Sequence, residues 1–147
     1  MKVKKIPAIL LAVILSCSCA SVPASAREAT QAVQYEIELL YQYALSANSY
    51  LTLTSNSAEC VSKCTGVANV KSITIDHTIQ KFWGLWIWNN VDGANWSKTT
   101  KATSASLVSN FKGLETGTYR LKSEFTVTTT DGKTETFTVY SSESTVS

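Results

Sequence analysis

The chain has 147 residues, of which 44% are apolar and 16% charged, a size and composition that suit one domain with a buried core. Its formal charge of +2 includes three lysines among the first five residues, whereas residues 27–147 hold ten basic and eleven acidic side chains. This balance leaves no charge excess for binding phosphates, so we expect no nucleic-acid partner.

Residues 1–26 have the layout of a secretory signal peptide. A lysine-rich start precedes an apolar run from Ile6 to Leu15, and Ala24-Ser25-Ala26 supplies a small-residue cleavage site. The run is too short for a permanent membrane helix. We therefore predict a secreted protein with a short N-terminal segment over residues 27–36 and one domain over residues 37–147.

Cys17 offers a second export route. The segment Ile14-Leu15-Ser16-Cys17 resembles a bacterial lipoprotein box, in which the cysteine is acylated and anchors the protein at the cell surface. Leu15 stands where that box usually has a smaller residue, so free secretion is the favoured prediction and lipid anchoring the alternative.

Residues 35–45 fit two kinds of element. Large apolar side chains alternate with polar ones over most of the segment, as in a strand, but several of them also fall on one helical stripe, and the composition favours helix. Periodicity alone leaves both open. Leu51 and Leu53, alternating with Tyr50 and Thr52, indicate a strand.

Once residues 1–26 are removed, Cys60 and Cys64 are the only cysteines. In an extended strand their Cα atoms would lie about 13 Å apart, whereas a disulfide needs less than about 7 Å. No glycine, proline or asparagine between them favours a turn. We expect two small apolar side chains that face a core, and no metal site or cofactor, because the single histidine lies elsewhere.

Strict alternation of apolar and polar residues marks the segments 70–80 and 118–127 as half-buried strands. Asp92-Gly93 and Asp131-Gly132 are dipeptides that favour tight hairpin turns. Short strands with turn signals at this spacing predict an all-β fold, an antiparallel β-sandwich of about seven strands.

Several short motifs occur in an order and spacing that resemble a known family. They include Tyr41-Gln42-Tyr43, Ala58-Glu59-Cys60, Ile73-Thr74-Ile75, Trp96-Ser97-Lys98 and Gly117-Thr118-Tyr119-Arg120, and they span about residues 39–142. The family consists of small secreted Gram-positive proteins with an immunoglobulin-like β-sandwich and no assigned function. The resemblance implies that fold, a strand at residues 41–43, and no catalytic residues.

Tyr119 begins a predicted strand directly after Leu114-Glu115-Thr116-Gly117. A tyrosine in this position stabilises the corner between two strands in many sandwiches, because its phenolic OH forms a hydrogen bond with the backbone a few residues upstream. We expect this structural role for Tyr119.

The segment 82–88, Phe-Trp-Gly-Leu-Trp-Ile-Trp, departs from the alternation because both of its faces are apolar. The sequence places Phe82, Trp86 and Trp88 on one face and Trp83, Leu85 and Ile87 on the other. A sandwich of this size has room inside for one such face, so the other must meet something else. Gly84 favours a tight turn that would leave Trp83 and Leu85 most exposed.

The surplus of apolar side chains has three interpretations. Residues 27–34 or a twisted first strand could cover the hairpin and make it ordinary core. A protein partner or a membrane surface could contact it, or its aromatic rings could form a stacking platform for a carbohydrate. The candidate binding residues are Phe82, Trp83, Leu85, Trp86 and Trp88.

No catalytic motif fits the sequence. His77 lies on the apolar face of its predicted strand, where a neutral, hydrogen-bonded histidine is the expected state. Asp76 points to the opposite face, and no nucleophile-elbow motif occurs. We predict a non-catalytic exported module for extracellular binding or surface interaction. The alternative is a small membrane-active or antagonistic protein that places the Trp-rich hairpin in a lipid interface.

Overall fold

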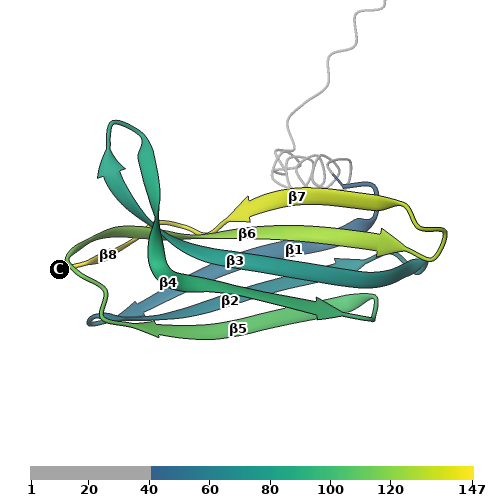
Figure 1. The fold of residues 1–147 in the computed structure, drawn as a ribbon, viewed down its shortest axis with the longest axis horizontal. Helices are drawn as coiled ribbons and strands as arrows, with labels where there is room; N and C mark the ends of the chain where they lie inside the picture. Colours follow the sequence, from purple (N-terminus) through teal and green to yellow (C-terminus); the bar gives the residue numbers. More distant parts are fainter. Residues whose placement is uncertain (1–40) are drawn as a thin grey trace, which may run out of the picture.

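The computed structural model describes residues 41–147, which form two antiparallel β-sheets packed face to face (Figure 1). One sheet has the order β1-β2-β5, with strands Ala44–Thr54, Ser57–Gly66 and Ser104–Lys112. The other has the order β4-β3-β6-β7, with strands Ile87–Thr100, Val70–Gly84, Gly117–Thr129 and Thr134–Tyr140. A short strand β8, Ser144–Val146, pairs with the start of β6.

The predicted all-β antiparallel sandwich is therefore confirmed, with eight strands among the described residues instead of about seven. The predicted signal peptide, its cleavage site, Cys17 and the segment 27–36 lie outside these residues. No helix within residues 41–147 is long and apolar enough to cross a membrane.

Alternation in the sequence sets which side chains enter the core. In β6 every second residue from Tyr119 to Thr129 is buried, while the residues between them are partly exposed. The buried apolar side chains form two clusters, one around Ile75 and Phe125 and the other around Ile79 and Leu121. His77 and Ser123 occupy the positions between these clusters, so a polar layer divides the core.

Two local predictions are wrong. Tyr41-Gln42-Tyr43 is not a strand: it precedes β1, and the carboxylate of Glu135 accepts hydrogen bonds from the backbone N–H groups of Gln42 and Tyr43 at 2.8 and 2.7 Å. A carboxylate that captures two consecutive N–H groups holds the chain away from the sheet register.

Asp92-Gly93 is not a hairpin turn. Asn90 and Asn95 both pair with β3, opposite Gln80 and Thr78, so residues 91–94 form an enlarged bulge within β4. Asp131-Gly132 does lie in the β6–β7 turn as predicted, and Gly132 adopts a φ of 83° there. The bulge in β4 matters for the site, because it lies where the β3–β4 hairpin leaves the sandwich.

Candidate binding hairpin

Leu85 and Trp86 form the turn at the end of the β3–β4 hairpin. Gly84 pairs with Ile87, which leaves a two-residue connection with positive φ at both positions, 49° for Leu85 and 67° for Trp86. This is the pattern of a type I′ turn, which normally carries Asn-Gly or a similar dipeptide. Two bulky apolar residues in this left-handed region store backbone strain.

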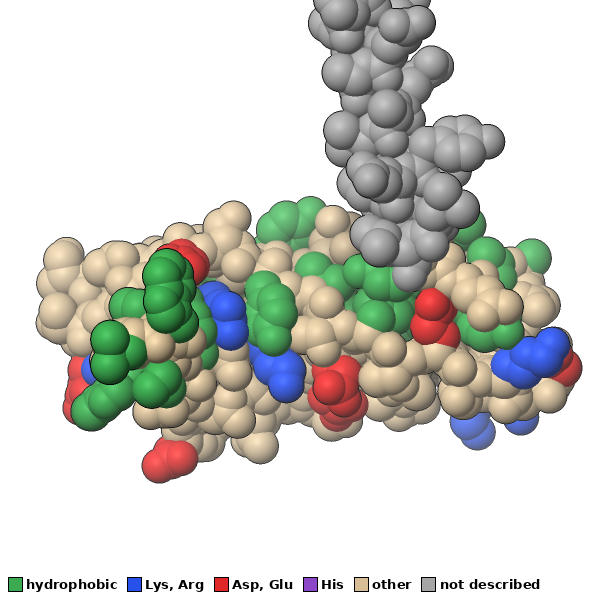
Figure 2. Space-filling model, turned by 90° about the horizontal axis from the view of Figure 1, so that it is seen from above, with side chains coloured by type: hydrophobic (Ala, Val, Ile, Leu, Met, Phe, Trp, Pro, Cys, Tyr) green, Lys and Arg blue, Asp and Glu red, His purple; other side chains and the backbone are tan. Residues whose placement is uncertain are grey.

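The hairpin stands away from the sandwich (Figure 1). Trp83, Leu85 and Trp86 are 74%, 89% and 92% exposed, and Ile87 is also exposed. Figure 2 shows this gathering of hydrophobic side chains at one end of the molecule. Among residues 41–147, nothing covers the apex of the hairpin, which we define as Leu85 and Trp86.

The structure corrects the sequence-based assignment of the apex. The sequence favoured Trp83 and Leu85 as the most exposed residues, but the turn lies one residue later and Trp86 is the most exposed. Phe82 and Trp88 do share a face, because they are direct cross-strand partners. Trp86 does not continue that face, since it belongs to the turn.

The base of the hairpin is braced by Arg120 of β6. Its guanidinium lies 4.1 Å from the ring centres of both Trp88 and Tyr140, an arrangement that gives cation–π attraction on each side. The Arg120 Nε donates to Gln80 Oε1 at 3.0 Å, and Gln80 Nε2 donates to Asn90 Oδ1 at 3.0 Å. This row of side chains crosses the four strands β7, β6, β3 and β4 and supports the base of the hairpin where it leaves the sheet.

The five candidate residues therefore fall into two groups. Phe82 and Trp88, whose rings lie 5.2 Å apart, form the supported base, and Trp88 is only partly exposed. Trp83, Leu85 and Trp86 project into solvent. Sequence reasoning missed Arg120, although its position opposite Gln80 on the outer face of β6 follows from strand pairing.

The other face of the hairpin borders an open groove, which we call the Trp83 groove. Its volume is about 480 Å³, and its lining comes from the hairpin, the β4 bulge and the β5–β6 connection. Lys81 Nζ and Glu115 Oε2 form an ion pair of 3.0 Å within this lining. Below it, the Tyr119 OH donates to the Glu115 carbonyl at 2.7 Å, which confirms the predicted corner role of this tyrosine.

His77 is buried as predicted, with 1% exposure, and it lies at the centre of the polar layer. Its Nδ1 lies 2.8 Å from Ser62 Oγ, and its Nε2 lies 2.7 Å from Ser109 Oγ. Ser62 contacts Ser123 at 2.7 Å, and Ser123 contacts Ser49 at 2.8 Å. One chain of side-chain hydrogen bonds thus joins strands β1, β2, β3, β5 and β6.

The donor and the acceptor in each of these hydrogen bonds follow from the number of protons that the side chains carry. The Ser49 hydroxyl lies 3.3 Å from the Leu121 carbonyl oxygen, which can only accept. If each hydroxyl donates towards that carbonyl, the imidazole carries its proton on Nδ1 and accepts from Ser109 at Nε2. Every polar atom of the chain is then satisfied by a neutral histidine. Burial accordingly lowers the pKa of His77 to about 4.

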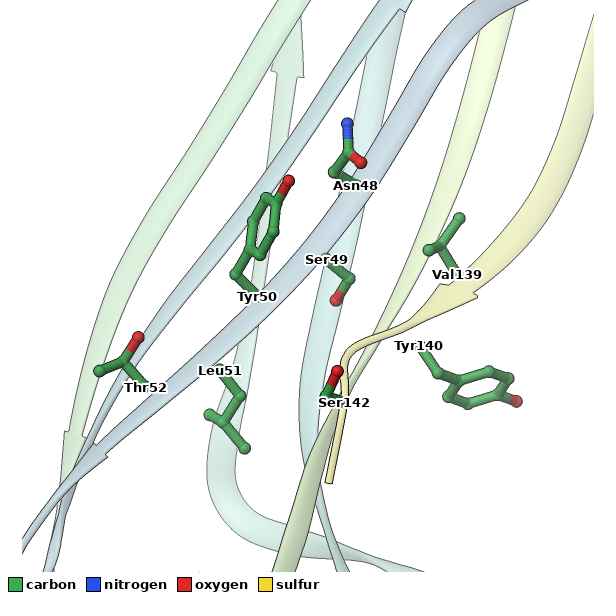
Figure 3. A pocket seen from close by; sticks show the side chains of 8 residues that line it. All are labelled: Asn48, Ser49, Tyr50, Leu51, Thr52, Val139, Tyr140 and Ser142. Atoms are coloured by element: carbon green, nitrogen blue, oxygen red, sulfur yellow. The ribbon is translucent and has the colours of Figure 1, made fainter. Parts of the chain in front are cut away.

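Ser62 and His77 have the spacing of a nucleophile and its base, but both are buried, so solvent-borne substrate has no access to either. The polar layer comes near the surface at its two ends, Ser49 and Ser109, each 8% exposed, and Ser49 lines a shallow pocket of about 320 Å³ between β1 and the end of β7. Figure 3 shows Ser49 and Ser142 pointing toward one another across this pocket. The arrangement suits a structural core network.

Cys60 and Cys64 are free and buried on the core face of β2, as expected. Burial raises the pKa of both thiols to about 11, so they are protonated at neutral pH. Residues 41–147 contain no group of three or more His, Cys, Asp or Glu side chains that could hold a metal ion. No protein-family model and no curated protein matches the chain.

Proposed function

We propose that this chain is an exported, non-catalytic module that contacts an extracellular partner or surface through the apex of its β3–β4 hairpin. The observation that carries the proposal is the exposure of Leu85 and Trp86 at a turn whose backbone favours small polar residues. A chain selected only for folding would gain stability from Asn-Gly at this turn. Strained backbone and exposed apolar surface at one place mark a contact site.

The same proposal includes an immunoglobulin-like fold. In such domains strands A, B and E form one sheet and strands C, F and G the other, with C′ added beside C in some. The observed orders, β1-β2-β5 and β4-β3-β6-β7, correspond to A-B-E and C′-C-F-G. Tyr119 at the start of β6 matches the corner tyrosine of strand F, which supports membership in the secreted family that the sequence resembles.

A double substitution tests the apex without disturbing the fold. Leu85→Asn with Trp86→Gly installs the preferred turn and removes both side chains. The matched control is Tyr50→Ser with Val108→Ser, which removes two exposed apolar side chains from the flat outer face of the β1-β2-β5 sheet. Binding of labelled protein to Gram-positive cell envelopes should disappear in the apex variant and persist in the control. Equal binding by both variants would refute the proposal.

Export has its own measurement. Mass spectrometry of the mature protein should find Arg27 at the N-terminus if the chain is freely secreted. An acylated Cys17 at the N-terminus would show the lipid-anchored alternative, and an intact Met1 would contradict both.

The shape of the apex favours a second candidate, a membrane-active protein. Apolar side chains project from a narrow convex tip, which can enter a lipid interface without a complementary groove in a partner. Tryptophan is favoured at that interface. Phosphatidylcholine vesicles with and without phosphatidylglycerol should then blue-shift the Trp emission of the protein, and the apex variant should abolish the shift. A protein-binding module predicts no change.

A further inference from the structure

The Trp83 groove has the features of a small-molecule site that is separate from the apex. It lies where the hairpin leaves the sheet, and its volume of about 480 Å³ is within the range of ligand pockets in proteins. Three structural features build it: the bulge of β4, the turn after β5 and the corner held by Tyr119. The side chains that line the groove therefore form one candidate site.

Aromatic surface forms one part of the lining. Trp83 presents an indole that is 74% exposed, and the partly exposed ring of Phe111 adds apolar surface deeper in the groove. The Tyr119 ring is only 1% exposed, so it supports the groove from beneath through the hydrogen bond from its OH to the Glu115 carbonyl. An exposed indole can take the flat apolar face of a ring against it.

An amide and a carboxylate form the other part. Asn89 and Asp92 lie around the start of the β4 bulge and line the groove. The neighbouring Asn90 also borders the groove, but its side chain lies on the opposite face of the hairpin, where its Oδ1 accepts from Gln80. Within residues 41–147 the side chains of Asn89 and Asp92 make no hydrogen bond, which leaves their donors and acceptors for a ligand.

The charges of the groove argue against an anionic ligand. Lys81 is the only cation in the lining, and its ammonium is already paired with Glu115 at 3.0 Å. Asp92 adds a negative charge without a partner among the described residues. A phosphate or a carboxylate would therefore meet net negative charge here. A neutral ligand with many hydroxyl groups fits the Asn89 amide and the Asp92 carboxylate, because a hydroxyl both donates and accepts.

We propose that the Trp83 groove binds a neutral saccharide unit, with one face of the sugar ring on Trp83 and its hydroxyl groups hydrogen-bonded to Asn89 and Asp92. Aromatic stacking selects the flat face of a ring, and the two polar side chains select its hydroxyl pattern. The apex is not required for this binding, so the inference goes beyond the proposed contact of Leu85 and Trp86 and does not rest on it.

An array of neutral mono- and oligosaccharides, N-acetylated sugars included, tests the proposal on the secreted protein, with sialylated and phosphorylated sugars as the anionic set. We expect binding within the neutral set only. For the best neutral sugar, calorimetry should show a loss of affinity of tenfold or more in Trp83→Ala and in Asn89→Ala, and a smaller loss in Trp83→Phe. Leu85→Asn with Trp86→Gly should bind that sugar like the wild type.

Three results would overturn the inference. The first is an array without any neutral ligand, the second is a preference for the anionic set, and the third is unchanged affinity in Trp83→Ala. Thermal unfolding of each variant separates lost binding from lost fold. If the apex variant loses envelope binding while Trp83→Ala retains sugar binding, the inference fails and the proposed apex contact stands; the reverse result rejects the apex and keeps the groove.

Discussion

The sandwich body and the β3–β4 hairpin have the same strand geometry, but the body buries its large apolar side chains and the hairpin exposes them. In the body, alternate residues of β6 enter the core, and the side chains of Leu121, Phe125 and Val127 are completely buried. In the hairpin, Trp83, Leu85 and Trp86 have no second sheet above them and remain in solvent. An alternating strand buries one face only where another layer exists to cover it. The contrast separates residues that make the fold from residues available for function.

The largest expected change in stability comes from removing an aromatic ring from the body, and the test compares it with removal of a ring from the apex. Phe125→Ala removes a buried ring from the body and should lower the free energy of unfolding by about 3–5 kcal/mol. Trp86→Ala removes a larger ring from the apex and should change it by less than about 0.5 kcal/mol. Urea unfolding of both variants measures the difference. A destabilisation of several kcal/mol by Trp86→Ala would mean that the apex is covered in the full chain.

The polar layer of the body provides a test by pH. His77 is neutral when folded because burial lowers its pKa to about 4, whereas in the unfolded chain its pKa is near 6.5. Between these values the unfolded state binds the extra proton, so stability is complete above pH 6.5 and is lost as the pH falls towards 4. The shift corresponds to a loss of about 3 kcal/mol over that window.

A His77→Gln variant isolates this effect. Gln can keep hydrogen bonds to Ser62 and Ser109 but does not titrate, so its stability should lack the decline between pH 6.5 and 4 that the wild type shows. The nearby ionisable groups, Cys60 and Cys64, stay protonated throughout because their pKa values are raised to about 11. An identical pH profile for wild type and variant would mean that His77 is charged in the folded protein.

At the apex, we expect a substitution that increases the free energy of unfolding. Leu85→Asn with Trp86→Gly replaces two strained left-handed residues by the dipeptide that type I′ turns prefer. Relief of this strain should raise the free energy of unfolding by about 1–2 kcal/mol. Chemical denaturation measures the gain. A destabilised variant would show that the two side chains make packing contacts that the exposed fractions do not reveal.

Sequence alone predicted the body better than the hairpin. The alternation of β3 and β6, the buried, hydrogen-bonded His77 and the corner bond of Tyr119 all follow from residue type and spacing. These features depend on side chains that have one stable environment. A residue that must be buried and satisfied leaves few alternatives, so the pattern determines its place.

The errors within the hairpin occurred where turn preference and strand register compete. Asp92-Gly93 has the composition of a hairpin turn, but β4 pairs with β3 on both sides of it and absorbs the dipeptide in a bulge. The real turn at Leu85 and Trp86 carries residues that such turns disfavour, so the neighbouring Gly84 indicated its position only to within one residue. The role of Arg120 could not be predicted from the sequence, because it depends on contacts with Trp88 and Tyr140 that form only in the folded sheet.

Trp83→Ser with Leu85→Ser should have little effect on folding. Both side chains are largely in solvent, so their joint removal should change the free energy of unfolding by less than about 1 kcal/mol. The variant lacks one residue of the apex and one of the Trp83 groove, so it should lose both envelope binding and sugar binding while its circular dichroism spectrum is unchanged. A variant that unfolds would instead assign these residues to a core, and the distinction between body and hairpin would fail. Because the substitutions alter both proposed contacts at once, a variant that keeps both activities would leave the hairpin without a binding role.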